Sequence, residues 1–101
     1  GRVEPFILTL ESGATSGPHS LKHSGHEFVY CLQGEFEYEV EGRRFSFEPG
    51  DSMLFASQMS HRWRNSGKGD ALLLVVLSGF EVDERPSEYH LQVGHRQAGG
   101  Q

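Results

Sequence analysis

Hydrophobic and polar residues alternate one for one in the middle of the chain. Residues 35–41 alternate glutamates with three apolar side chains, which are Phe36, Tyr38 and Val40. Residues 43–47 repeat this period of two, which is typical of strands with one buried face. Because Glu41-Gly42 lies between the two segments, we predict a β-hairpin. Arginines of its second strand should offset part of the glutamate row across the pair.

Similar patterns predict short strands along the rest of the chain. Apolar or alternating runs between turn residues indicate strands at 3–10, 21–32, 52–56, 61–65 and 71–77, and a weaker one at 89–93. The run 71–77 is apolar on both faces, which favours a position in the middle of the core. No helical period is convincing. We therefore predict an all-β antiparallel sandwich or barrel, with its core in residues 1–78 and a polar tail in 79–101.

Composition limits the functions to consider. The chain has 101 residues, enough for one domain, and a formal net charge of −5 without a basic run. We therefore expect no direct binding to nucleic acid and none to a membrane. A single cysteine, Cys31, fits a reducing compartment such as the cytoplasm. Its strand parity predicts a small core residue, and a thiol that lines the pocket is the alternative. Because the chain starts at Gly1, we expect it to be part of a longer protein.

Two histidines and a glutamate have spacings that suit a metal site. His23 and Glu27 are four residues apart, so on a strand they point to the same face, and His61 follows downstream. Two imidazoles and one carboxylate on a rigid sheet suit a divalent metal with open positions for water or substrate. His19 shares the parity of His23 and is the candidate for a fourth ligand. His26 has the opposite parity and should point outward.

These residues resemble the two motifs of the small cupins, which are single-domain β-barrels with jelly-roll topology. The first motif ends in His-x-His-x3-Glu-x6-Gly, and its second half is matched by His23, Glu27 and Gly34. The second motif, Gly-x5-Pro-x-Gly-x2-His-x3-Asn, is matched by Gly50, His61 and Asn65. Phrases such as Pro-Gly-Asp-Ser and His-Arg-Trp-Arg-Asn look like the cupin domain that follows a helix-turn-helix domain in bacterial regulators.

The resemblance covers about residues 5–78, and it departs from the motifs at three positions. The first histidine of the family falls on Leu21, and the inner Pro and Gly fall on Ala56 and Gln58. The resemblance therefore implies three metal ligands, His23, Glu27 and His61. They would hold one divalent ion of iron, manganese, nickel or zinc. The alternative is a metal-free, hydrogen-bonded pocket.

Inward strand positions around these ligands predict a mostly apolar pocket, the usual composition of a small-molecule site. Its expected lining is Val29, Phe36, Tyr38, Met53, Phe55 and Trp63. Asn65 and Tyr30 are the expected supports of the metal ligands. Arg62 and Arg64 alternate with Trp63 and should face outward, away from a bound acid.

Two functions follow from this site. The resemblance to regulator-attached cupins implies a sensor that binds a small organic ligand, and the open metal triad suits an oxygenase, isomerase or epimerase of a small organic acid or sugar. An enzyme needs a general acid or base beside the metal, and no second inward carboxylate or lysine stands out. We therefore favour the sensor. We also expect a homodimer, because the segments Val3 to Leu10 and Tyr89 to Val93 could cover an edge of a second copy.

Overall fold

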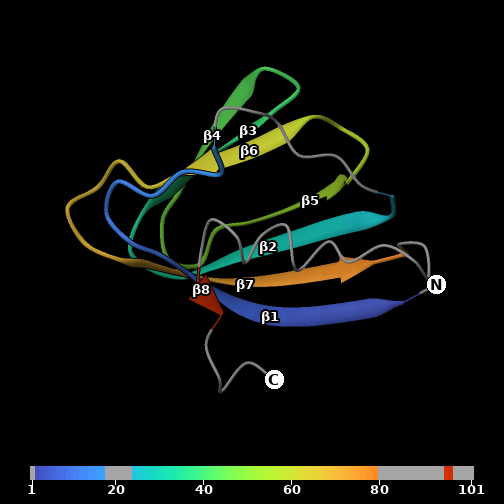
Figure 1. Ribbon diagram of the computed structural model, residues 1–101, viewed down its shortest axis with the longest axis horizontal. Helices are drawn as coiled ribbons and strands as arrows, with labels where there is room; N and C mark the ends of the chain where they lie inside the picture. The colour runs from blue at the N-terminus through green and yellow to red at the C-terminus, as the bar shows by residue number, and fades with distance from the viewer. Residues whose placement is uncertain (1, 18–23, 80–94, 97–101) are drawn as a thin grey trace.

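The computed structural model describes residues 2–17, 24–79 and 95–96, and its regular elements in these ranges are all β-strands. They are β1 (Val3–Leu10), β2 (His26–Gln33), β3 (Phe36–Val40), β4 (Arg43–Phe47), β5 (Ser52–Ala56), β6 (His61–Arg64), β7 (Ala71–Ser78) and β8 (His95–Arg96) (Figure 1). No described segment is a helix long and apolar enough to cross a membrane.

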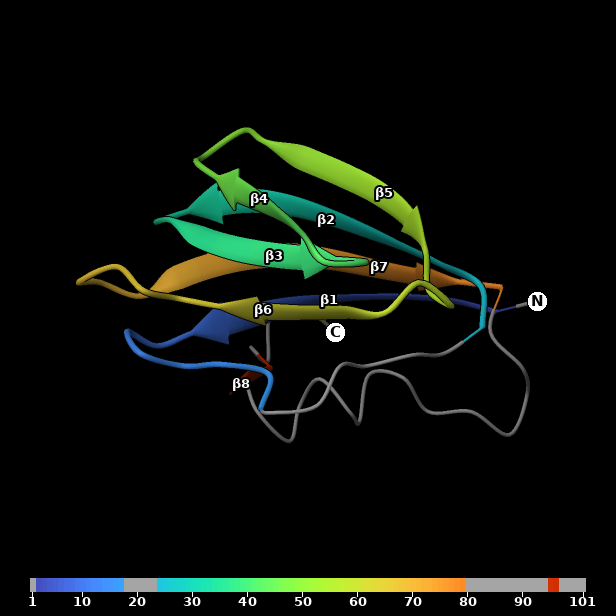
Figure 2. The ribbon, with the colours of Figure 1, turned by 90° about the horizontal axis from the view of Figure 1, so that it is seen from above.

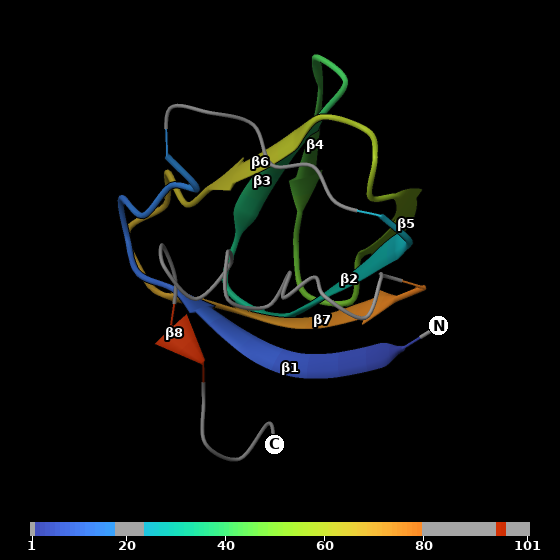
Figure 3. The same cartoon turned by 45° about the vertical axis from the view of Figure 1, so that its right-hand side comes forward.

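The strands form two sheets that face each other. The larger sheet has the order β5-β2-β7-β1-β8 and the smaller one β4-β3-β6, and the pairings within both are antiparallel. Figures 2 and 3 show the smaller sheet stacked over the larger one, with the inner faces turned toward each other. The predicted fold, an antiparallel jelly-roll barrel, is confirmed.

Alternation along each strand sorts its side chains between the core and the outer surface. In β7 the residues Ala71, Leu73, Val75 and Leu77 are buried, whereas the residues between them are half-buried. β7 lies between β2 and β1 and pairs with both. The predicted central position is therefore correct, but only one face of β7 enters the core, because no layer of the described structure covers the other face.

The predicted hairpin is β3–β4, with Phe36 opposite Phe47 and Val40 opposite Arg43. Glu41 and Gly42 both have positive φ angles, 49° and 79°, as a two-residue turn between twisted strands requires. Arg44 Nε lies 3.9 Å from Glu39 Oε2, so an arginine of the second strand does offset part of the negative charge of the glutamate row.

The two segments expected to help pair two copies lie at the ends of the chain. The predicted strand at 89–93 lies outside the described residues, and the short β8 follows it, pairing with Leu8 and Thr9 of β1. β1 itself pairs with β7 along its whole length. β1 therefore belongs to the larger sheet of its own chain, and the expected pairing of two copies stays a prediction.

Candidate functional site

A buried carboxylate joins the two sheets. Glu27 of β2, Tyr38 of β3 and His61 of β6 are each 0% exposed. The Tyr38 hydroxyl donates a hydrogen bond of 2.9 Å to Glu27 Oε2, and His61 Nε2 lies 3.3 Å from Glu27 Oε1. We call these three residues the Glu27 cluster. The strand parity predicted from the sequence places Glu27 and His61 together, as expected.

Burying a charge costs free energy unless partners compensate it, so the contacts of the Glu27 cluster matter. Burial raises the pKa of Tyr38 well above its usual value, and the nearby charge of Glu27 and the hydrogen bond to it raise it further. Tyr38 therefore stays a phenol and keeps donating its proton to Glu27. Strand parity alone does not predict this contact, because it places Tyr38 only in the pocket wall.

A backbone carbonyl fixes the orientation of the His61 ring on the side away from Glu27. Its Nδ1 lies 2.7 Å from the backbone carbonyl of Met59, which can only accept, so Nδ1 carries a proton. Nε2 then faces Glu27, and the Phe55 ring packs edge-on against the imidazole at 5.0 Å. A histidine held in this way presents Nε2 either as the second proton donor of an ion pair or as a metal ligand.

The spacing of the two facing atoms fits a shared metal ion. Two ligand atoms bound at the usual lengths to one tetrahedral or octahedral ion lie about 3.0–3.4 Å apart, and the separation of Nε2 from Oε1 is 3.3 Å. Within the described ranges, no group of three or more His, Cys, Asp or Glu side chains is placed to hold a metal. His23 and His19, the other predicted ligands, lie outside the described residues, so the third ligand stays a prediction. His26 is exposed, as its parity predicts.

The residues expected to support the metal ligands lie elsewhere. The buried amide of Asn65 donates to the carbonyls of Leu10 and Gly69 at 2.9 and 2.8 Å, and its oxygen accepts from the Gly67 amide. Asn65 thus shapes the turn before β7. Tyr30 is half-buried and alternates with the inward residues of β2, so its side chain is on the outer face.

The predicted pocket residues gather in the core. Five of the six are buried, namely Val29, Phe36, Tyr38, Phe55 and Trp63, and Met53 packs against them half-buried. The Tyr38 ring lies 5.8 Å from Trp63 and 6.0 Å from Phe55. An aromatic wall therefore surrounds the Glu27 cluster.

One expectation about charge is wrong. No second inward carboxylate was expected, but Glu4 of β1, which is half-buried, shares the inward parity of the fully buried Phe6 and Leu8. The signal was the strict alternation of β1, which the neighbouring Pro5 concealed.

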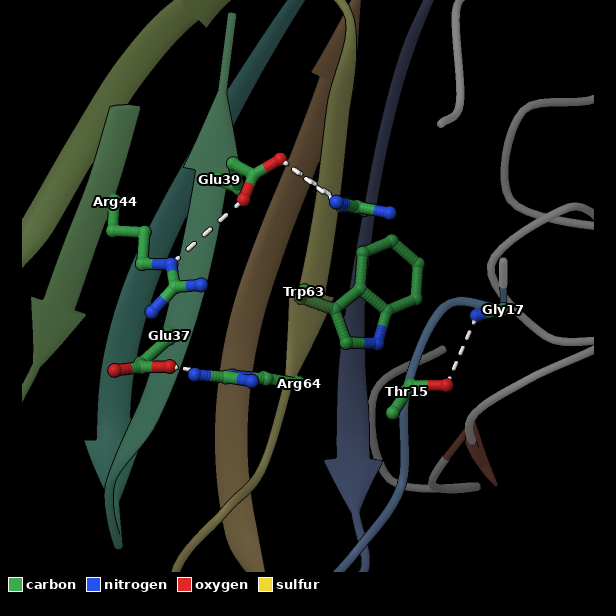
Figure 4. A pocket seen from close by; sticks show the side chains of 8 residues that line it. Thr15, Gly17, Glu37, Glu39, Arg44, Trp63 and Arg64 are labelled. Atoms are coloured by element: carbon green, nitrogen blue, oxygen red, sulfur yellow. Dashed lines mark hydrogen bonds and ion pairs between the residues drawn. The ribbon is translucent and has the colours of Figure 1, made fainter. Parts of the chain in front are cut away.

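A cleft of about 330 Å³ lies on the outer surface beside β6 (Figure 4). Its lining is Thr15, Gly17, Glu37, Glu39, Arg44, Arg62, Trp63 and Arg64. Arg64 Nε donates to Glu37 at 2.6 Å and Arg62 Nε to Glu39 at 3.1 Å, which confirms that both arginines face outward. Because these side chains are partly exposed, the ion pairs add little stability.

Comparison with known protein families identifies the fold unit. The model of the cupin domain family, Cupin_2, matches residues 6–77. The chain belongs to the cupin family. The match spans the strands from β1 to β7, and with them the Glu27 cluster.

Relatives of this cupin domain include regulators and enzymes. It is 34% identical over 67 residues to the uncharacterized HTH-type transcriptional regulator YobQ of Bacillus subtilis, covering 65% of this chain and 28% of that protein. The crystal structure of the Cupin_2 domain of an XRE family transcriptional regulator from Enterobacter cloacae has a TM-score of 0.70 at 24% identity, covering 76% of this chain and 81% of that one. At this identity it shows the fold.

A third neighbour is a predicted oxalate decarboxylase from Thermotoga maritima, with a TM-score of 0.63 and 30% identity over 70% of this chain and 61% of that one. The chain spans 28 to 66% of the lengths of the curated relatives that it matches.

Proposed function

We propose that this cupin domain is the small-molecule sensor of a bacterial transcription regulator that acts in the cytoplasm. The observation that carries the proposal is the Glu27 cluster, in which polar groups from both sheets meet inside an aromatic wall. A ligand bound there touches both sheets, so it can favour one arrangement of them over another. The similarity to YobQ supports the attachment to a regulator.

We also propose that Glu27, His61 and His23 hold one divalent metal ion, which is iron, manganese, nickel or zinc. The metal would supply an open coordination position for an oxygen or nitrogen atom of the ligand. Tyr38 holds Glu27 in place through Oε2, and the Met59 carbonyl fixes the ring of His61. These contacts support the metal site in the way that hydrogen bonds to ligating side chains usually do.

The alternative is a metal-dependent oxygenase, isomerase or epimerase acting on a small organic acid or sugar. It is favoured by the 30% identity to a structure described as a predicted oxalate decarboxylase. The two functions differ in whether the bound compound is changed.

A thermal-shift screen of organic acids, amino acids, amines and sugars, with and without each metal, tests the proposal. A sensor ligand should raise the stability by about 2.7 kcal/mol at a hundredfold excess over Kd, and mass spectrometry should recover it intact. The stabilisation should be lost in Glu27→Ala and kept in His26→Ala. Turnover that requires the metal and disappears in Glu27→Ala would instead establish the enzyme.

Pairing into a homodimer remains part of the proposal. Since β1 is paired within its own chain, we propose that a second copy packs against the outer face of the larger sheet. This face carries half-buried Phe28, Tyr30, Leu74 and Val76 beside Leu54, which is 67% exposed. The register places Leu54 and Val76 on either side of Phe28, so the apolar side chains are contiguous.

A further inference from the structure

The inner face of the smaller sheet carries an arginine at one end. Arg43 of β4 is opposite Val40 of β3, and Val40 is opposite His61 of β6. Val40 and His61 are buried, so this row of three residues lies on the inner face, and Arg43 is its exposed end. Adjacent strands lie about 4.8 Å apart, so the Cα atoms of Arg43 and His61 are about 10 Å apart across β3. A long, positively charged side chain therefore starts in the same row as His61 of the Glu27 cluster.

Arg43 differs from the other arginines of this sheet in having no carboxylate partner. The other three face outward and lie 2.6–3.9 Å from glutamates of β3. Arg43 forms no ion pair in the described part of the chain, and its Cζ atom lies over the ring of Phe45, 5.6 Å from the centroid. Phe45 is the next inward residue of β4 and is half-buried. Contact with a ring face uses none of the five N–H donors of a guanidinium group, so Arg43 keeps them for an anion.

β4 and β5 are edge strands on the same side of the barrel. Each is the last strand of its sheet, and the two do not pair with each other (Figures 2 and 3). Their inner faces carry Phe45 and Met53, which pack against the core but are only half-buried. The inward residues of the interior strands β2, β3 and β7 are buried. Among these strands, solvent therefore reaches the inner face along β4 and β5, where Arg43 lies.

A buried hydroxyl group without a partner borders the Glu27 cluster. Ser57 continues the inward alternation of β5 after Phe55 and is 0% exposed. Its Oγ has no hydrogen-bond partner among the described residues. Because Phe55 is opposite Glu27, Ser57 is the diagonal neighbour of Glu27, with the two Cα atoms about 7–8 Å apart. A buried hydroxyl group without a partner costs about 1–3 kcal/mol, so a ligand that bonds to Ser57 Oγ removes this cost.

The charges on this side of the barrel favour an acid next to Arg43. Glu27 is engaged by Tyr38 and His61. Glu4, the other inward carboxylate, is on β1, which β7 separates from β2 and β5. β4 lies over the side of the larger sheet that β2 and β5 form, away from β1 (Figure 2). A guanidinium group binds a carboxylate through two parallel hydrogen bonds, whereas it repels an ammonium group.

Building on the proposed function, we propose that Arg43 binds the carboxylate of a small hydroxy acid whose hydroxyl group lies at Ser57, beside the Glu27 cluster. The guanidinium group of Arg43 donates two hydrogen bonds to the carboxylate, and Ser57 Oγ bonds to the hydroxyl group of the ligand. The carbon atoms between the two groups lie against Phe45 and Met53. Arg43 is thus the residue that selects an acid over an alcohol or amine of the same chain.

Nuclear magnetic resonance titrations of the domain, with and without Zn²⁺, test this inference with two matched series of probes. One series is glycolate, ethylene glycol and ethanolamine, and the longer one is γ-hydroxybutyrate with the diol and the amino alcohol of the same chain. The three compounds of a series share one hydroxyl group and differ only at the other end. In the wild-type domain an acid should bind tighter than its diol and its amino alcohol.

Variants of Arg43 test which group binds the acid. Arg43→Gln should weaken the binding of that acid about tenfold or more, because it removes charge-assisted hydrogen bonds. Arg43→Lys keeps the charge without the planar fork and should restore part of the affinity. Arg44→Gln, which removes the same charge from the next residue on the outer face, is the matched control and should leave the affinity unchanged.

Ser57→Ala tests the second contact. It should weaken the binding of the same acid about two- to tenfold, because one hydrogen bond to the ligand is lost. Thermal unfolding of the variants separates binding from folding. Arg43→Gln changes an exposed side chain and Ser57→Ala removes a hydroxyl group without a partner, so both should unfold close to the wild-type temperature.

Equal affinity of the acid for Arg43→Gln and the wild type would overturn the inference. So would an acid preference that is lost in Arg2→Gln, at the exposed arginine before β1, and kept in Arg43→Gln. Equal affinity for Ser57→Ala and the wild type would overturn the placement of the hydroxyl group. In these cases the domain still binds a small molecule, so the proposed function stands. Binding of no probe by the folded domain would also overturn the inference, and metal titration of Glu27→Gln then tests the proposed function separately.

Discussion

Replacing Tyr38 by phenylalanine tests the Glu27 cluster with a single oxygen atom. The hydroxyl donates a 2.9 Å hydrogen bond to Glu27 Oε2, and both side chains are fully buried. A hydrogen bond to a charged group contributes about 1.5–3 kcal/mol to stability, and its loss here leaves a buried carboxylate oxygen without a donor. Because the aromatic ring stays in place, no large cavity adds to the cost. We therefore expect Tyr38→Phe to lower the free energy of unfolding by about 2–3 kcal/mol.

Urea unfolding followed by tryptophan fluorescence measures this cost. Trp63, the single tryptophan, is buried with its ring 5.8 Å from that of Tyr38, so its emission reports directly on this region. At the urea dependence typical of small domains, the midpoint should fall by about 1–2 M. Tyr30→Phe, on the outer face, is the matched control and should change the stability by less than about 0.5 kcal/mol.

A double-mutant cycle with Glu27→Gln isolates the charge. In the Glu27→Gln background Tyr38 donates to a neutral amide oxygen, so Tyr38→Phe should cost only about 1 kcal/mol. The account of the Glu27 cluster would be refuted if Tyr38→Phe cost no more than Tyr30→Phe, or if its cost were the same in both backgrounds.

Three further predictions concern other parts of the fold. Burial is the main cause that raises the pKa of the Cys31 thiol above 9.0, so on raising the pH the thiol ionises in the unfolded chain before it does in the folded one. The free energy of unfolding of the wild type should therefore fall relative to that of Cys31→Ala as the pH rises above about 9. Gly34 and Gly42 both have a φ angle of 79°, but a Cβ atom at Gly34 would lie 2.5 Å from the Asp70 carbonyl oxygen, whereas one at Gly42 would meet no atom within 4 Å. In urea unfolding, Gly34→Ala should therefore lower the free energy of unfolding by about 1–3 kcal/mol more than Gly42→Ala does. Sedimentation of the wild type should give a dimer mass and Leu54→Lys a monomer mass; a wild-type monomer, or a dimer in both, would contradict the proposed pairing.

The fold could be predicted because its signals are local. The alternation in residues 35–47 fixes the hairpin, since a one-residue slip would move Phe36 and Tyr38 from the core to solvent. Inward parity likewise predicts that Glu27 and His61 face the same interior. Both inferences need only the alternation of apolar and polar residues along a strand and the position of a turn.

The rest of the site depends on contacts between distant strands. Which inward group reaches Glu27 is decided by the packing of the smaller sheet on the larger one, so the role of Tyr38 could not be derived from its parity. Asn65 matches a motif position, yet its side chain bonds to the backbone of Gly67 and Gly69 in a turn and of Leu10 at the end of β1, which spacing alone does not show. β8 pairs with the edge of β1 that β7 does not occupy, and no pattern in the sequence predicts which part of that edge it takes.

The central claim is that the Glu27 cluster belongs to a metal site, and isothermal titration of the metal-stripped domain with Zn²⁺, Mn²⁺, Ni²⁺ and anaerobic Fe²⁺ tests it most directly. The account predicts one ion bound per chain, with the affinity mostly lost in His61→Ala and Glu27→Gln and kept in His26→Ala, whose side chain points outward. A His61→Ala variant that binds as tightly as the wild type, or a His26→Ala variant that does not bind, would contradict it.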